Sequence, residues 1–373
     1  MSNKTFISTK GINPGDEFIL KGILNLIKYD ENTEIKVLNK HKPFIETKVL
    51  DNKGEYFLNW RITKYFILFV NLIFKSIKKN SLKNTTIIHA GQPFFYKFKS
   101  FIFNITTFNS MWFLNFYKFN FINKNSKLLL LALGTTVYNN QQFDSILNDK
   151  KFIKKVKSLG NKSNLITTRD LKTKLIFDKA GVDSQYLPCT AFFSANQESL
   201  NDNNEYILLN FMKNGSNNYK ELNINQEIWQ KKIKAIVQKL ELLNVPIRFV
   251  SHTTEDFYFQ NKNFPNYENF FSENSEDFYP IYQNSIGGIF NRIHGAFLSL
   301  SNLKPTICIN QDSRIEMFEI LETKTYMTKD ISEVEVVEEF TKLVRNYDSN
   351  KKKLASLKKE YSEKYLSIIK EFI

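Results

Sequence analysis

The sequence predicts an α/β protein made of two Rossmann-like halves that face a cleft, followed by C-terminal helices. Three observations lead to this fold class. Short apolar runs alternate with segments of helical apolar spacing, which is typical of parallel sheets covered by helices. A polar stretch without apolar rhythm, residues 196–205, divides this alternation into two series. The chain, at 373 residues, is also longer than one hydrophobic core usually supports.

We therefore expect an N-terminal domain at residues 1–195, a linker at 196–205, a C-terminal domain at 206–330 and charged helices at 331–373. Strands are predicted at 5–9, 34–38, 85–89, 128–133, 165–168 and 186–189 in the first half, and at 206–211, 247–250, 285–290 and 306–310 in the second. Helices are predicted at 18–27, 62–77, 171–180, 224–243, 277–283, 296–303 and 315–321.

Composition excludes several classes of function. The net charge of +14 would suit an anionic substrate, an anionic membrane or nucleic acid, but no nucleic-acid-binding signature accompanies it. Four scattered histidines give no metal motif, so we expect no metal. Two cysteines, no secretory signal and no apolar run of about 20 residues favour a cytoplasmic protein.

The stretch 94–121 is rich in Phe, Tyr and Lys and includes Trp112. We favour core-packing helices for it, because aromatic side chains dominate buried contacts. Aromatic and Lys side chains also suit a lipid interface, so peripheral contact with the inner face of the membrane is the alternative.

The most informative stretch is residues 290–296, where a predicted strand ends and a helix begins. A helix start at the carboxyl end of a parallel strand favours an anion. Arg292 supplies a fixed fork of donors, and His294 supplies a proton that titrates near neutral pH. This indicates a phosphate or carboxylate site with acid–base help. The alternative is a surface arginine beside a histidine that caps its helix.

Another candidate ligand site is the glycine-containing loop that follows the first predicted strand. Gly11 and Gly15 would let backbone approach a ligand closely, and Asp16 falls in the first turn of the next helix. Asp16 could instead be a plain helix cap.

Several separated pieces, in order, resemble the polysaccharide pyruvyl transferase family. They are Asn13-Pro14-Gly15-Asp16, Leu133-Gly134, Thr168-Arg169-Asp170 with Leu175 and Gly181-Val182, Arg292-Ile293-His294-Gly295 with Lys304-Pro305, and Asp312 to Arg314. The resemblance spans about residues 5–322 and implies a GT-B-like architecture. The chain departs from the family at Cys189, where an Asp often stands, and at Arg314, where a Lys is common.

The resemblance implies that a pyruvyl group moves from phosphoenolpyruvate to sugar hydroxyls of a glycan, which is possibly lipid-linked, and that no cofactor is needed. His294 would be the acid and Asp16 the base. The donor would be held by residues of three motifs: Arg169, Arg292, Arg314, Gly15 and Gly295. We expect Arg169 and His294 to face each other across the cleft.

Other interpretations stay open at this stage. Arg169 could form a surface ion pair with Asp170 or Asp178, and Arg314 could lie on a helix surface. A glycosyltransferase with a nucleotide-sugar donor would use the same cleft, with residues 213–215 as a weak candidate for the diphosphate. A non-catalytic scaffold at the membrane surface would rest on residues 94–121 and on the charge.

Overall fold

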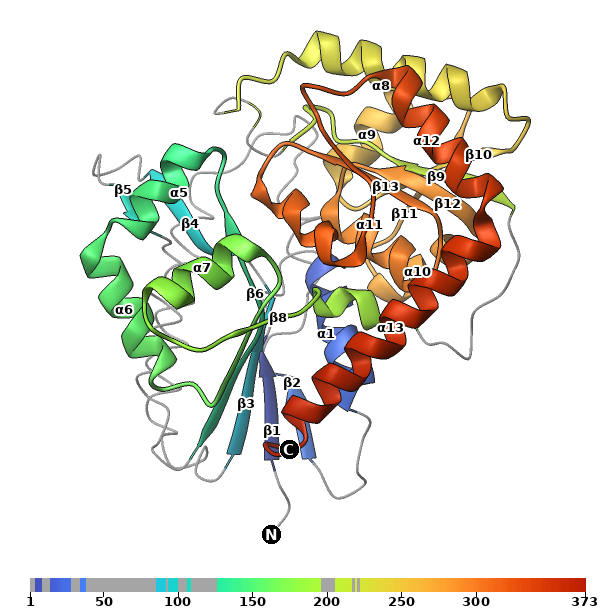
Figure 1. Cartoon of the computed structure of the whole chain (residues 1–373). Helices are drawn as coiled ribbons and strands as arrows, with labels where there is room; N and C mark the ends of the chain where they lie inside the picture. Colours follow the sequence, from blue (N-terminus) through green and yellow to red (C-terminus); the bar gives the residue numbers. More distant parts are fainter. Residues whose placement is uncertain are drawn as a thin grey trace.

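The computed structural model describes residues 4–8, 14–27, 34–37, 85–91, 93–99, 106–108, 126–195, 205–216, 219 and 222–373. These residues form two mainly parallel sheets surrounded by helices, one in each half of the molecule (Figure 1). The predicted α/β class is confirmed. The first sheet is built from residues 4–186 and the second from residues 206–327. The domain limits stay predictions, and residues 196–204 of the expected linker lie outside the described residues.

The first sheet has the strand order β2-β1-β3-β6, and β7 and β8 continue beyond β6. Its strands are β1 (Lys4–Ser8), β2 (Glu34–Val37), β3 (Thr85–Ala90), β4 (Pro93–Lys99), β5 (Thr106–Phe108), β6 (Lys127–Thr136), β7 (Leu165–Thr168) and β8 (Gln185–Tyr186). One face is covered by α5 (Asn140–Leu147), α6 (Lys150–Gly160) and α7 (Leu171–Lys179), and the other by α1 (Pro14–Ile27). Leu128 and Leu130 of β6 pack on the first face, whereas Leu129 and Leu131 pack on the second. Burial on both faces explains the continuous leucine run.

Strand β6 carries an irregularity that positions its carboxyl end. The register to β7 shifts between Leu130 and Leu133, and Ala132 has a φ of 50°. The Thr167 hydroxyl accepts from the Ala132 amide at 2.7 Å, which holds this left-handed residue in place. Such a bulge re-aims the strand. Beyond it, β6 pairs with β4 and brings Gly134 to the end of β7.

The second sheet is wholly parallel, with the order β11-β10-β9-β12-β13-β14. Its strands are β9 (Tyr206–Asn210), β10 (Ile247–Ser251), β11 (Glu268–Phe271), β12 (Ser285–Phe290), β13 (Thr306–Asn310) and β14 (Thr325–Met327). The helices are α8 (Gln226–Glu241), α9 (Thr254–Asn263), α10 (Phe278–Gln283), α11 (Ile293–Ser301), the 3₁₀ helix η5 (Ser313–Leu321) and α12 (Glu333–Arg345). Counted within this half, the order is 3-2-1-4-5-6, which is that of a Rossmann fold.

The two halves share a buried core. Helix α1 belongs to the first sheet by sequence, yet its Phe18 ring lies 5.9 Å from the His252 ring and 6.0 Å from the Phe278 ring of the second half. One apolar cluster contains residues of α1, of strands from both sheets, of α11 and of the 3₁₀ helix η2 (Thr190–Phe193). Apolar burial therefore fixes α1 and α11 relative to each other.

The C-terminal helix α13 (Tyr347–Ile369) begins beside the second half and returns to the first (Figure 1). The Tyr365 hydroxyl donates to the Pro188 carbonyl at 2.8 Å. The Nζ atom of Lys358 is buried and donates to the carbonyls of Ala195, at 2.9 Å, and Ser301, at 2.7 Å. Burial lowers the pKa of Lys358 to about 7. Lys358 thus joins α13, the end of the first half and the last residue of α11.

Several predicted elements need correction. Residues 93–99 and 106–108 of the aromatic stretch are the strands β4 and β5, so the expectation of helices there is wrong. The predicted burial of the aromatic side chains in this stretch concerns side chains that the structure does not describe. The predicted helix 62–77 also lies outside them. Residues 313–321 form a 3₁₀ helix instead of an α-helix, and α9 was not predicted. In the described part of the chain, no helix is long and apolar enough to cross a membrane.

Candidate active site

In each sheet the chain adds strands first on one side of a central strand and then on the other, and a helix begins next to this switch point. In the first sheet β1 lies between β2 and β3, and α1 follows β1. In the second sheet β9 lies between β10 and β12, and α11 follows β12. Open α/β sheets bind ligands at the carboxyl ends of their strands at such switch points. The first turns of α1 and α11 are therefore the candidate site.

These two first turns touch. A Cβ atom added to Gly15 of α1 would lie 2.0 Å from Nδ1 of His294 on α11. Only glycine leaves room for the imidazole there. The N-cap of α11 is Arg292, which has no side-chain capping bond, and the His294 ring lies against α1 at Gly15. Asp16 follows Gly15 in the first turn of α1 and is 3% exposed.

Gly295 lies over a buried pair of side chains. A Cβ atom at Gly295 would come 2.9 Å from the Tyr282 hydroxyl and 3.3 Å from Cε1 of His252. His252 Nε2 and the Tyr282 hydroxyl are 2.8 Å apart. Burial, assisted by the nearby Arg292 charge, lowers the pKa of His252 to about 3, so this imidazole is neutral near pH 7. The pair supports the first turn of α11 without adding charge to it.

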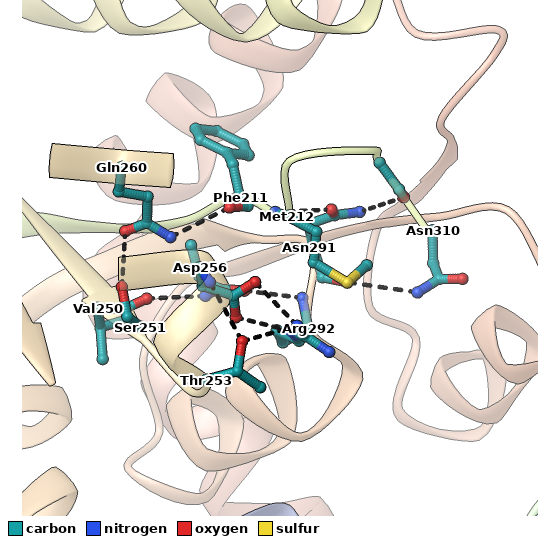
Figure 2. Close-up of polar contacts among 12 residues, drawn as sticks. Phe211, Met212, Val250, Ser251, Thr253, Asp256, Gln260, Asn291, Arg292 and Asn310 are labelled. Carbon is teal, nitrogen blue, oxygen red and sulfur yellow. Dashed lines mark hydrogen bonds and ion pairs between the residues drawn. The ribbon is translucent and has the colours of Figure 1, made fainter. Parts of the chain in front are cut away.

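Arg292 is held by a buried carboxylate (Figure 2). Its Nε and Nη2 atoms each donate to the Asp256 carboxylate at 2.8 Å, and Nη2 also donates to the Thr253 hydroxyl at 3.2 Å. Asp256 is 1% exposed, whereas the Arg292 side chain keeps 19% of its surface exposed. Such a bidentate pair fixes the plane of the guanidinium. Thr253 caps α9 through the Asp256 amide, so this capping places Asp256 beside Arg292.

Three buried asparagines end neighbouring strands or directly follow them, and we call them the asparagine network: Asn210, Asn291 and Asn310. Figure 2 labels Asn291 and Asn310. The Asn210 amide oxygen accepts from the Arg292 backbone at 2.9 Å. Asn291 donates to the Ile309 and Gly215 carbonyls and accepts from the Met212 amide. The network fixes the backbone that carries Arg292 and the loop after β9. Buried amides with every partner in place make such a frame rigid.

In the first half, Arg169 lies against bare backbone at the end of β7. A Cβ atom added to Gly134 would lie 2.5 Å from Nε of Arg169. Nη1 of Arg169 donates to the Cys189 sulfur at 3.5 Å. Arg169 is 1% exposed, and among the described residues its Nε has no hydrogen-bond partner. Asp178 pairs with Lys174 instead. Burial contradicts the alternative that Arg169 forms a surface ion pair.

Asp170, the residue after Arg169, stabilises the same corner. Its carboxylate accepts from the amides of Thr135, at 3.0 Å, and Thr173, at 2.7 Å, and thereby caps α7. Burial raises the pKa of Asp170 to about 6, although these hydrogen bonds oppose the shift. The capping bonds tie the carboxyl end of β6, next to Gly134, to α7.

Arg314 lies where η5 meets the first half. It forms a two-atom pair with Asp312, with Nε–Oδ1 at 2.8 Å and Nη2–Oδ2 at 2.6 Å. The side chain of Arg314 is 19% exposed, so a plain helix-surface position is wrong. The adjacent Ser313 hydroxyl accepts from the Val137 amide and donates to the Thr135 carbonyl, both at 3.0 Å. Arg314 is thus fixed at a hydrogen-bonded seam between the halves.

The structure brings together some of the predicted residues. Gly15 and His294 touch, and Gly295 and Arg292 flank them on α11. Arg169 is placed with Gly134 and Cys189, and its expected position facing His294 stays a prediction. Sequence reasoning missed Asp256, Tyr282 and the asparagine network. An Asn at or next to the end of three β-prone runs, 206–211, 285–290 and 306–310, is the signal that could have indicated the network. No cluster of three His, Cys, Asp or Glu side chains that could hold a metal occurs within the described ranges.

A family model described as polysaccharide pyruvyl transferase matches residues 13–313. A search of curated proteins finds no match.

Among solved structures, a putative UDP-N-acetylglucosamine 2-epimerase from Listeria monocytogenes is 13% identical, with a TM-score of 0.57 over 95% of this chain and 91% of its own. The UDP-GlcNAc 2-epimerase from Neisseria meningitidis, bound to UDP-GlcNAc, is 12% identical, with a TM-score of 0.56 and full coverage of both chains. A glycosyltransferase from Rickettsia africae is 11% identical, with a TM-score of 0.50 over 100% of this chain and 98% of its own. At these identities the likeness concerns the fold, which is GT-B-like.

Proposed function

Because the chain belongs to the polysaccharide pyruvyl transferase family, we propose that it moves a pyruvyl group from phosphoenolpyruvate to sugar hydroxyls of a cell-surface or exopolysaccharide glycan. The product is a ketal, and phosphate is released. The observation that carries the proposal is the contact of Gly15 with His294, where the first turns of α1 and α11 meet. Two helix N-termini with a titratable imidazole between them suit a doubly anionic substrate that must be protonated.

The transfer reaction balances when two hydroxyls of the acceptor take part. Both oxygens bond to C2 of the enol, and the bond from C2 to the phosphate oxygen breaks. The two hydroxyls release two protons. C3 gains one proton and becomes a methyl group, and the other proton leaves with the phosphate. His294 is our candidate to protonate C3 or to assist phosphate departure, and Asp16 our candidate base for the hydroxyl.

Phosphoenolpyruvate carries a phosphate and a carboxylate close together, so it needs more than one cationic contact. We assign Arg292 and Arg314 to the second half of the donor site and Arg169 to the first. Arg292 and Arg314 are already oriented by carboxylates, and Arg169 keeps a buried Nε–H that a ligand oxygen could accept. The backbone amides of Gly15 and Gly295, in the first turns of α1 and α11, are our candidates to contact the donor anion. No cofactor enters this scheme.

The experiment is phosphate release from phosphoenolpyruvate over a panel of glycan acceptors, with UDP-GlcNAc as the competing donor. Acceptor-dependent phosphate release is expected with phosphoenolpyruvate, and no UDP release is expected with UDP-GlcNAc. UDP release alone would favour a glycosyltransferase. Turnover of neither donor across the panel would favour a scaffold. We expect the enzyme in the cytoplasm, where this donor is made.

A further inference from the structure

Helix α6 lies at the outer side of the first half, away from the second sheet (Figure 1), and its exposed residues are strongly cationic. Its eleven residues include Lys150, Lys151, Lys154, Lys155 and Lys157, all exposed, and no acid. Its apolar residues, such as Phe152 and Val156, are buried in the core beneath. A charge run is usually a solvated face, so a second feature is needed to indicate a partner.

The second feature is a surface hollow of about 350 Å³ beside α6. Four lysines line it: Lys150, Lys154, Lys157 and, from the end of α7, Lys179. Apolar side chains, among them Ile153, complete the lining, and no acid belongs to it within the described residues. The nearest acids in sequence are engaged elsewhere, since Asp149 caps α6 and Asp178 pairs with Lys174.

The third feature is an apolar stripe that leads into this hollow. Leu171 is 45% exposed and Leu175 is 50% exposed on α7. They precede Lys179 at four-residue spacing, which places the three side chains on one face of the helix. The stripe starts beside the ion pair of Lys172 with Glu316, at the seam between the halves. It therefore runs from the seam between the halves to the lysine hollow.

We propose that this face, which we call the α6–α7 face, binds an anionic membrane surface. Lysines attract acidic headgroups, and exposed leucines next to them can enter the headgroup region, a combination that suits the lipid–water interface. A nucleic acid would use the lysines but not the leucine stripe. Docking by this face would bring the seam near a lipid-linked acceptor. It is separate from the aromatic stretch 94–121, whose side chains lie outside the described residues.

The test is co-sedimentation of the full chain with vesicles of phosphatidylcholine, with and without phosphatidylglycerol. Wild type should bind the acidic vesicles and lose binding as salt rises. The triple variant Lys150→Glu, Lys154→Glu, Lys157→Glu should bind at least about 100-fold more weakly, because each lysine near an acidic surface contributes about fivefold and the new glutamates repel the headgroups.

The leucines provide the readout that separates a membrane from other polyanions. Leu171→Ser with Leu175→Ser should weaken vesicle binding about tenfold and keep its salt dependence, since apolar area is lost and charge is not. Binding of a duplex DNA should be unaffected by this change. If the leucine changes leave vesicle binding intact while the lysine changes abolish it, the face is only a general polyanion surface, and the proposal fails.

Matched controls lie on α8 and α13. Lys231→Glu, Lys234→Glu and Lys352→Glu make the same charge change at exposed positions elsewhere. Ile228→Ser with Leu242→Ser removes side chains that are 52% and 78% exposed. Both controls should bind acidic vesicles within a few-fold of wild type. Equal losses in the controls, or no binding by wild type, would overturn the proposal. None of these outcomes depends on the donor assignment.

Discussion

In the first half, glycine backbone lies directly against two candidate site side chains, Arg169 and His294, whereas in the second half Arg292 is fixed by hydrogen bonds. In the first half, Gly134 lies under the Arg169 guanidinium and Gly15 lies under the His294 ring. In the second half, the asparagine network and Asp256 fix the Arg292 backbone and side chain. A steric contact tolerates no added atom, while a hydrogen-bonded frame fails when a partner is removed. Substitutions in the first half should therefore affect mainly the reaction, and those in the second should also affect folding.

The largest effect is expected at Arg292. Arg292→Ala leaves the buried Asp256 carboxylate without its cation, so the free energy of unfolding should fall by about 3–5 kcal/mol. Phosphoenolpyruvate binding should weaken roughly 30- to 150-fold. Urea unfolding and calorimetry measure the two quantities.

The double variant Arg292→Ala with Asp256→Ala separates the two roles. It should recover much of the stability, because no unpaired charge remains, and should still bind the donor weakly. Recovery of donor affinity together with stability would mean that Arg292 serves only to neutralise Asp256.

Asn291 tests the hydrogen-bonded frame. Asn291→Ala removes three buried hydrogen bonds, to Met212, Gly215 and Ile309, and should cost about 3 kcal/mol of unfolding free energy. The control is Asn263→Ala, which removes a single bond to the Phe259 carbonyl and should cost about 1 kcal/mol. Equal losses of stability in the two variants would argue against a special frame in the second half.

Gly15 tests the steric contact. Gly15→Ala places a methyl group where the His294 ring lies, so α1 or the ring must move, and a displacement of about 1 Å can slow a reaction by about 100-fold. The rate of phosphate release at saturating donor is the measurement. Lys21→Ala, on the same helix, removes an exposed ion pair with Glu276 and should leave the rate within a few-fold. An unchanged rate in Gly15→Ala would show that the contact has no part in the reaction.

The smallest effect concerns Lys358, which joins the halves through α13. Its folded pKa of about 7 lies below the ordinary value of 10.5. Between these values the unfolded chain binds the proton and the folded chain does not, so stability rises with pH. From about pH 7.5 to 9.5, wild type should gain about 2 kcal/mol more than Lys358→Met. Parallel pH dependences of the two proteins in urea unfolding would contradict the buried neutral lysine.

Local patterns in the sequence predicted the elements that carry the site. Strand β12 and the turn to Arg292 follow from an apolar run that ends at a polar residue before helical spacing, and β7 with Arg169 follows in the same way. The motif order also led to Gly15 and His294. Both kinds of signal depend on residues that are close in sequence: periodicity for the strands and helices, and short motifs for Gly15 and His294.

Long-range pairing could not be predicted in the same way. Asp256 lies 36 residues before Arg292, on a helix without a clear apolar rhythm, and only the fold brings the two together. The asparagines bond to backbone atoms of other strands, so their position at the strand ends is visible in the sequence but their partners are not. The aromatic residues 93–99 form a strand paired with β6, which the β-propensity of Phe and Tyr favours and the prediction of helices overlooked.

We propose that His294, whose ring lies against Gly15 where the first turns of α1 and α11 meet, moves the proton in a reaction of phosphoenolpyruvate. The most direct test of this proposal is the rate of acceptor-dependent phosphate release by His294→Asn at saturating donor, with donor affinity measured by calorimetry on the same samples. We expect a rate about 100-fold or more below wild type and a donor affinity within a few-fold of it. A wild-type rate would contradict the claim and make the histidine a packing residue.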